Sequence, residues 1–310
     1  MKSLPYHLRS NKSVDRYLFV EVIKRVISLG ASSEDYGYVG FGGPFLEDLK
    51  IIDHYFPEMK LTSIEEKSEV VKRQRYHRFR RGIQLLKATD QEFVDSLEDE
   101  ALLVFWLDYM GCEPRNFEVF SNAIKKAANW SVLRITLNAS FTDRKEFKES
   151  FFKDFEQILP ANAESYFENE NRYLLLLQQM LRIATTPPPM ADYDFRLLSS
   201  VSYRDGRRML TITGLKCADA DWSKVEQVFS RWPFFTEGWS AIPTRVNVPD
   251  LSLQERNRLA SRLPSSKNVG HQLHKCLGYS VAGDTVASIT DLENYAAFSR
   301  YFPTFAKLAI

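Results

Sequence analysis

Five short apolar segments of this sequence each end in glycine or in a polar side chain, and these end residues have the types that could do chemistry. A glycine turn lets a ligand approach bare backbone, and carboxylates can hold hydroxyl groups or take up a proton. The residues are Gly40, Gly42 and Gly43 after a first segment, then Glu65-Glu66, Thr89-Asp90, Asp108-Tyr109 and Asn138 after the next four.

The segments themselves alternate with helical patterns. Strands are predicted at Tyr38-Val39, 61–64, 83–88, 101–109 and 131–139, and helices at 14–28, 44–56, 67–78, 91–97 and 114–128. The run 101–109 is almost continuously apolar, as expected of a strand that is buried on both faces of a parallel sheet. Alternating strands and helices predict an α/β, Rossmann-like doubly wound sheet. The carboxyl ends of its strands meet at one edge, where ligands bind.

The later part of the chain has a different pattern. Residues 143–190 predict a helical insertion, and two β-rich runs joined across Asp205-Gly206 predict an antiparallel hairpin. We therefore expect one domain over 1–217 and a mixed C-terminal extension over 218–310, with helices at 252–262 and 290–300. Trp222, Trp232 and Trp239 are expected to close the core of this extension rather than form an aromatic cage.

Composition narrows the class of protein. A net charge of +1 excludes a broadly cationic surface for nucleic acid, although not a local patch. The three cysteines are far apart, without metal-ligand spacing, and they favour a reducing compartment. The N-terminus lacks the apolar core of a signal peptide, and the apolar runs are too short to cross a bilayer. We expect a cytoplasmic protein that does not enter a membrane.

The motifs GFGG at 40–43, SIEE at 63–66, ATD at 88–90, WLDYMG at 106–111 and LRITLNA at 133–139, followed by a hairpin, resemble the class I S-adenosylmethionine (SAM)-dependent methyltransferase fold. The combination of YVGFGGPFLED, SIEEKSEVVKRQR and WLDYMG is similar to a bacterial family of O-methyltransferases, some of them found near antiviral defence genes. The resemblance implies that SAM is the cofactor. It places Gly40, Gly42 and Gly43 at the methionine moiety, Glu65 at the ribose, and Asp90 with its neighbour Thr89 at the adenine.

A charge argument also favours SAM over a dinucleotide. Glu47 and Asp48 fall in the first turn of the helix that would receive a pyrophosphate, and two carboxylates there would repel it. The sulfonium and ammonium groups of SAM are compatible with them. Both residues would also complement the helix dipole, which is an equally good explanation for their presence.

Asp108 and Tyr109 are the candidate catalytic residues. A carboxylate at the end of so apolar a strand is costly to place there, and a functional role would explain its presence. The alternative is a strand end that bonds to neighbouring backbone. Asn138, Lys12 and Arg16 are candidate substrate contacts, although ordinary surface charge is the favoured interpretation of the two cations. Two oxygen ligands, from Asp108 and Asn138, are too few for a metal site, and none is predicted.

Six cations lie between positions 72 and 81, interleaved with aromatic residues. This basic run consists of Lys72, Arg73, Arg75, Arg78, Arg80 and Arg81. It would suit the phosphates of a nucleic acid, but a solvated helix end, balanced by the acidic stretch 90–100, is the favoured interpretation.

The sequence therefore predicts a SAM-dependent methyltransferase that acts on an oxygen or nitrogen nucleophile of an unknown acceptor. One position departs from the pattern of the resembling fold, because Tyr38 stands where an acidic residue is usual, two positions before the first glycine. That departure favours an alternative, a non-catalytic methyltransferase-like subunit that binds a protein partner in a multi-protein system.

Overall fold

The computed structural model of the chain describes residues 10–30, 32–264 and 267–301. It divides into two compact units. The larger comprises Val20–Ser202 and Arg207–Thr244, and the smaller comprises the chain up to Phe19, Tyr203–Gly206 and the chain from Arg245 onward. The division after Thr244 lies later in the chain than the predicted boundary after residue 217, and it gives the start of the first helix to the smaller unit.

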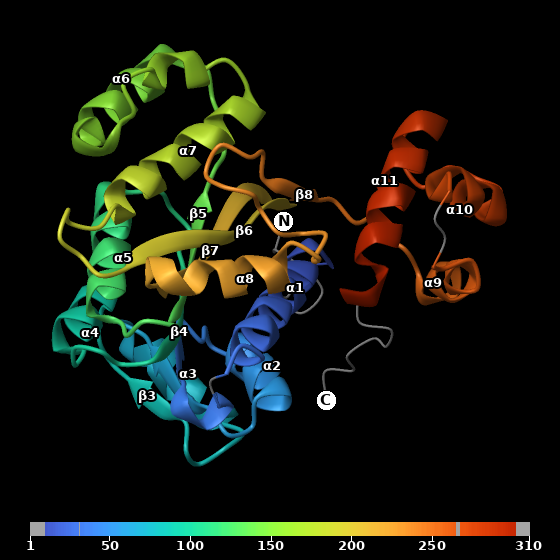
Figure 1. Cartoon of the computed structure of the whole chain (residues 1–310). Helices are drawn as coiled ribbons and strands as arrows, with labels where there is room; N and C mark the ends of the chain where they lie inside the picture. The colour runs from blue at the N-terminus through green and yellow to red at the C-terminus, as the bar shows by residue number, and fades with distance from the viewer. Residues whose placement is uncertain (1–9, 31, 265–266, 302–310) are drawn as a thin grey trace. The chain divides into compact units, whose positions relative to one another are not determined.

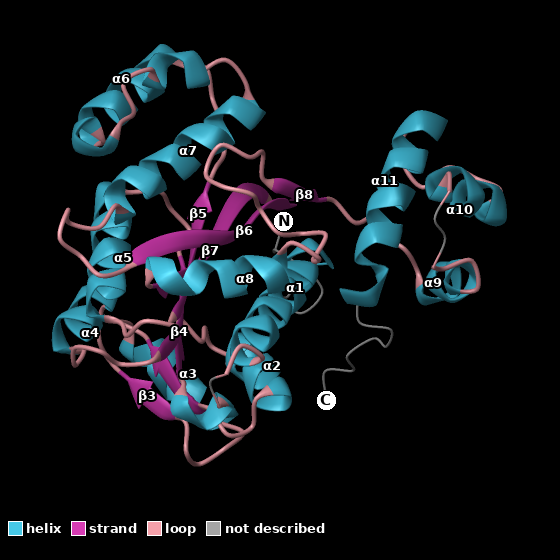
Figure 2. Cartoon of the chain, viewed as in Figure 1, coloured by secondary structure: helices cyan, strands magenta, loops and turns pink. Residues whose placement is uncertain are grey.

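One sheet contains eight strands in the order β3-β2-β1-β4-β5-β7-β6-β8. Strands β1 to β5 pair in parallel, and β5 pairs with β7 in antiparallel register. This order confirms the predicted doubly wound sheet with an antiparallel hairpin (Figure 2). The strands are β1 (Gly37–Gly40), β2 (Lys60–Ile64), β3 (Gln84–Leu86), β4 (Leu103–Asp108), β5 (Val132–Asn138), β6 (Asp194–Asp205), β7 (Arg207–Cys217) and β8 (Thr244–Val246).

The helices connect these strands much as the sequence predicts (Figure 1). Those up to the hairpin are α1 (Ser10–Ile27), α2 (Glu47–Tyr55), α3 (Ser68–His77), α4 (Asp90–Ser96), α5 (Pro114–Lys126), α6 (Lys145–Asp154) and α7 (Glu170–Thr185). After the hairpin come α8 (Trp222–Phe229), α9 (Leu253–Ala260), α10 (Val269–Leu277) and α11 (Thr285–Phe298). No helix in these described ranges is long and apolar enough to cross a membrane.

One helix start differs from its prediction. The helix expected from residue 44 begins at Glu47, because Gly43 and Leu46 both have left-handed backbone angles, with φ of 54° and 56°. A right-handed helix cannot pass through such residues. The stretch between them is a turn, and Leu46 is fully buried under it. Glu47 and Asp48 nevertheless stand in the first turn of α2, as predicted.

The core of the larger unit explains the apolar run of β4. Phe105 and Leu107 join a hydrophobic cluster with Leu133 and Ile135 of β5 and with residues of α5 and α7. Their neighbours in sequence, such as Trp106, point to the other face of the sheet and are buried as well. Both faces of β4 are therefore covered, as predicted.

Helices α9 to α11 belong to the smaller unit, and α10 packs closely on α11. A Cβ atom at Gly270 would lie only 2.5 Å from the carbonyl oxygen of Ile289, so a glycine is needed at this crossing. His271 and His274, three positions apart on α10, belong to no metal-binding group, because no group of three metal-ligating side chains is found among the described residues.

Candidate functional site

The register of the sheet places the candidate residues of four strands at one edge. Gly40, the last residue of β1, pairs with Ser63 of β2 and with Trp106 of β4. Asp108, the last residue of β4, pairs with Thr136 of β5, two residues before Asn138. Glu65 follows β2 directly, and its amide donates to the carbonyl of Leu86 at the end of β3, 3.0 Å away. The structure therefore brings Gly40, Glu65, Asp108 and Asn138 to the carboxyl edge.

The glycines after β1 have different roles. A Cβ atom at Gly42 would lie 2.6 Å from both Leu46 and the Ser63 hydroxyl, which accepts a hydrogen bond from the Gly42 amide at 3.1 Å. Gly42 is thus required for packing inside the turn. Gly43 has a φ of +54° with open space where its Cβ would be, and its carbonyl accepts a bond from the Gln74 side chain at 3.0 Å. Only Gly43 presents bare backbone to open space.

Gly40 lies against Tyr38, the residue that departs from the acidic pattern. A Cβ atom at Gly40 would be 3.0 Å from the Tyr38 hydroxyl and 3.3 Å from the carbonyl oxygen of Trp106. Tyr38 is 1 % exposed, so its ring extends beside the end of β1 rather than into solvent. A buried phenol therefore occupies the place beside Gly40 where the resembling fold usually has a carboxylate.

Glu65 is half-buried beside this turn. Its Oε1 accepts a hydrogen bond from the backbone amide of Lys67 at 2.8 Å, which fixes the direction of the carboxylate. A carboxylate has two oxygens and about four acceptor positions, so the bond to Lys67 leaves about three of them, enough for two further donors. Ribose hydroxyls are donors of that kind, and the predicted role of Glu65 stays a prediction.

Thr89 caps helix α4. Its hydroxyl accepts from the amide of Glu92 at 3.1 Å, while the Glu92 carboxylate accepts from the Thr89 amide at 2.8 Å, a reciprocal capping box. The bonds from Thr89 hold the pKa of the Glu92 carboxyl below its usual value. The hydroxyl of Thr89 thus already has a structural task at the start of the helix.

Asp90 is buried and bonded by three groups of the protein. Its carboxylate accepts from the Tyr109 hydroxyl at 2.5 Å, from the Arg115 guanidinium at 3.1 Å and from the Gln91 amide at 3.0 Å. These bonds tie the end of β4 to the starts of α4 and α5. The role of Asp90 at an adenine amino group stays a prediction, and the contacts observed here are ones that stabilise the fold.

The bond to Asp90 also determines the protonation state of the Tyr109 hydroxyl. Burial, the hydrogen bond and the negative charge of Asp90 all raise the pKa of Tyr109 above its ordinary value. The phenol is therefore protonated at neutral pH and donates to Asp90, and its ring stands edge-on to Phe41, with 5.5 Å between centroids. A general base must accept a proton, so of the two predicted catalytic residues Asp108 is the one suited to that task.

The three predicted substrate residues do not belong to the same unit. Asn138 is at the carboxyl edge, where its Oδ1 accepts from the Ser140 amide at 3.0 Å. Lys12 and Arg16 belong to the smaller unit and are only 3 % and 6 % exposed. The Lys12 ammonium donates to the Tyr203 hydroxyl at 3.0 Å. Surface charge is therefore the wrong explanation for these two cations, and their contact with substrate stays a prediction.

Part of the basic run serves the fold. Arg80 forms an ion pair with Asp53 of α2 at 2.7 Å and donates to the carbonyl of Met59 at 2.8 Å. The Arg73 guanidinium lies over the Phe45 ring, 4.4 Å from its centroid. These partners come from the neighbouring turn and helix and not from the acidic stretch 90–100. Binding of nucleic acid by the remaining cations stays a prediction.

Two residues of this edge were missed at the level of sequence. Arg115 holds Asp90 from another helix, 25 positions away, and nothing local in the sequence indicates that pairing. Gln74 is fully buried and holds the Gly43 carbonyl. The burial of Gln74 could have been predicted, because it lies three positions after the buried Val71, on the apolar face of α3.

Comparison with known proteins decides the family. The sequence matches the family described as "Putative O-methyltransferase" over residues 4–310. The chain belongs to this family. The resemblance proposed from YVGFGGPFLED and WLDYMG is thereby confirmed, and so is the prediction of a methyltransferase at the level of the family. A search of curated proteins finds no match.

Among solved structures, the fold of this O-methyltransferase family member has distant neighbours. A probable spermidine synthase from Corynebacterium glutamicum ATCC 13032 is 12 % identical over 77 % of this chain and 82 % of its own, with a TM-score of 0.43. The plantazolicin methyltransferase BpumL in complex with SAH is 12 % identical over 66 % and 85 %, with a TM-score of 0.42. Human N-acetylserotonin methyltransferase in complex with SAM is 13 % identical over 66 % and 57 %, with a TM-score of 0.34.

Proposed function

We propose that this protein binds SAM at the carboxyl edge of its sheet and transfers the methyl group to a hydroxyl oxygen of an acceptor. The observation that carries the proposal is the match to an O-methyltransferase family over nearly the whole chain, in a fold that ends β1 in an open glycine turn. An oxygen acceptor follows from the description of the family. A nitrogen acceptor is the less favoured form of the same proposal.

The residues of this edge fit SAM. Gly43 offers bare backbone next to open space, and Glu65 has carboxylate capacity for the two ribose hydroxyls. Glu47 and Asp48, at the N-terminus of α2, disfavour a pyrophosphate and are compatible with the positive charges of SAM. A sulfonium-bound methyl group is the chemistry that SAM supplies when it is bound.

In this reaction the residues of the protein would hold the acceptor and take up the proton of its hydroxyl group. The Asp108 carboxylate, at the end of β4, would accept the proton of the acceptor hydroxyl. Tyr109 would stay protonated beside it, because its hydroxyl is committed to Asp90. Such a site works mainly by positioning the two reacting groups and by electrostatics.

The test is calorimetry and thermal melting of the full chain with SAM and with its demethylated product, SAH. A ligand of the native state raises the melting temperature, and absence of both signals at millimolar ligand would refute the proposal. Glu65→Gln removes the charge that accepts the ribose hydroxyls and is expected to weaken SAM binding about tenfold or more. Glu66→Gln, at the exposed neighbouring position, is the matched control and should bind SAM normally.

A second function is favoured by Tyr38, whose buried phenol stands beside Gly40 in place of the usual carboxylate. On this alternative the protein is a non-catalytic subunit of a cytoplasmic, multi-protein system such as a bacterial defence system. The two functions differ in turnover. Transfer of a radiolabelled methyl group from SAM into components of a cell extract, lost in Asp108→Asn, supports the enzyme. SAM binding without any transfer supports the subunit.

A further inference from the structure

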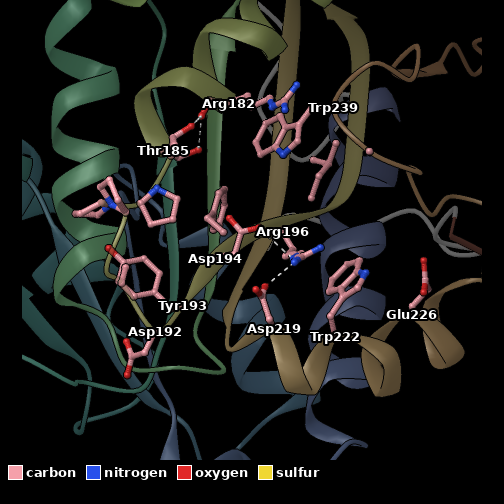
Figure 3. Close-up of a pocket in the computed structure, with 18 of the residues that line it drawn as sticks. Arg182, Thr185, Asp192, Tyr193, Asp194, Arg196, Asp219, Trp222, Glu226 and Trp239 are labelled. Atoms are coloured by element: carbon pink, nitrogen blue, oxygen red, sulfur yellow. Dashed lines mark hydrogen bonds and ion pairs between the residues drawn. The ribbon is translucent and has the colours of Figure 1, made fainter.

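A pocket of about 920 Å³ lies within the larger unit, a size typical of small-molecule sites (Figure 3). The end of α7 and the proline run 187–189 form one wall. The start of β6, the turn after β7 and the start of α8 form the opposite wall, and the loop 235–239 completes it. Nothing in the proposed methyl transfer uses this pocket.

Its position separates it from the candidate methyl-transfer site. Asp194 is the first residue of β6, and Asp219 follows the end of β7. Leu215, near the end of β7, pairs with Val132, the first residue of β5. The pocket therefore opens at the amino edge of the sheet, whereas Gly40 and Asp108 stand at the carboxyl edge. A ligand in the pocket would not compete with SAM for space.

The pocket is acidic. Its lining contains two arginines and five carboxylates, an excess of three negative charges. The carboxylates are those of Asp192, Asp194, Asp219, Glu226 and Glu237.

Arg196 shows what kind of group these walls hold. Its guanidinium pairs with Asp194 at 3.1 Å and with Asp219 at 2.6 Å, and it lies over the Trp222 ring, 5.2 Å from the centroid (Figure 3). A cation is thus already seated between carboxylates and an aromatic face. Among the described residues, Glu226 and Glu237 have no such cation beside them, and both are exposed.

The aromatic walls distinguish this pocket from a plain acidic surface. Trp222 and Trp239 are half-buried and line it, together with Phe235 and with Tyr193, whose ring already has the Lys216 ammonium 3.9 Å from its centroid. Of the three tryptophans expected to close a core, Trp232 is 2 % exposed and Trp239 packs against the core cluster. Trp239 and Trp222 also present surface to the pocket. Such faces attract organic cations and cover the methylene groups between them.

The distribution of the carboxylates indicates the shape of the ligand. They come from the loop before β6, the start of β6, the turn after β7, helix α8 and the loop at 237, and no three of them converge as the ligands of a metal ion would. Separated negative charges with apolar surface between them fit separated positive charges joined by methylene groups. We propose that this pocket binds a linear aliphatic polyamine.

The experiment is titration calorimetry of the full chain with spermidine as the probe, at 50 mM and at 300 mM salt. Saturable binding to one site is expected, weaker at the higher salt. The double variant Glu226→Gln, Glu237→Gln should weaken binding by about tenfold, the effect of two partly exposed ion pairs. The control Glu118→Gln, Glu146→Gln removes the same charge from exposed positions on α5 and α6 and should bind spermidine normally.

Four results would overturn the proposal. They are the absence of saturable heat, equal weakening in both double variants, displacement of spermidine by Mg²⁺ at equal concentration, and binding of a tetralysine peptide tenfold or more tighter than spermidine. The last would indicate a basic protein segment as the occupant. SAM binding, measured in the same variants, should be unchanged, so that failure here leaves the methyltransferase proposal standing.

Discussion

Removing one oxygen atom from Tyr109 tests whether the Asp90 contacts stabilise the fold. In Tyr109→Phe the ring and its edge contact with Phe41 stay, and only the hydroxyl bonded to Asp90 at 2.5 Å is lost. The two side chains are 8 % and 4 % exposed, so water replaces that bond poorly. A hydrogen bond to a charged group contributes about 1.5–3 kcal/mol. Asp90 keeps its bonds from Arg115 and from a backbone amide, which favours the lower half of that range.

The measurement is urea unfolding of three variants under identical conditions. Tyr36→Phe removes a bond from the tyrosine hydroxyl to a neutral carbonyl, that of Trp130 at 2.9 Å, and should cost about 1 kcal/mol. Tyr76, at 86 % exposure, is the surface control, and Tyr76→Phe should change stability by less than about 0.5 kcal/mol. The expected order of destabilisation is Tyr109, Tyr36, Tyr76. A Tyr109→Phe variant as stable as Tyr76→Phe would refute the reasoning.

Two further predictions rest on raised pKa values. Burial raises the pKa of Tyr109 and of Tyr173, so their stabilising contribution is complete below pH 10, the ordinary tyrosine pKa, and is lost as the pH rises above it. Melting temperatures between pH 8 and 11 should fall at the alkaline end, and less steeply in Tyr109→Phe. Burial also raises the pKa of Cys112 and Cys217 to about 12, so both thiols stay protonated at pH 8. Cys112 and Cys276 are both half-buried, and only Cys217 is fully buried. Iodoacetamide at pH 8, followed by peptide mass spectrometry, should label Cys276 first.

The fold was predictable because its strands carry strong patterns. The run 101–109 has no polar residue before Asp108. The Asp-Gly pair at Gly206 predicted the turn of the hairpin. Helix α2 started three residues later than predicted because Leu46 is left-handed, a conformation that leucine rarely adopts and that no local signal indicates. The short strand β8 and helix α8 were missed, since short elements leave little periodicity.

The placement of the candidate residues at one edge of the sheet was predictable, and their pairings were less so. The rule for parallel sheets located the carboxyl edge, and the register of Gly40 and Asp108 agrees with it. That rule does not say which polar groups are already hydrogen-bonded to other parts of the protein. Asp90 depends on Arg115 from another helix, and such a pairing follows only from the packing of whole elements.

The polar groups of the carboxyl edge can therefore be sorted by what the protein already does with them. Thr89 caps a helix, and Asp90 and Tyr109 bond to each other, so a ligand would have to compete with the fold for these groups. Glu65 makes one bond that orients it and keeps acceptor capacity, and Gly43 leaves open space. If SAM binds here, substitutions at Glu65 should change affinity more than stability, whereas a side chain at Gly43, with its φ of +54°, should cost stability as well. Substitutions at Asp90 and Tyr109 should change stability more than affinity, because their bonding energy is already part of folding.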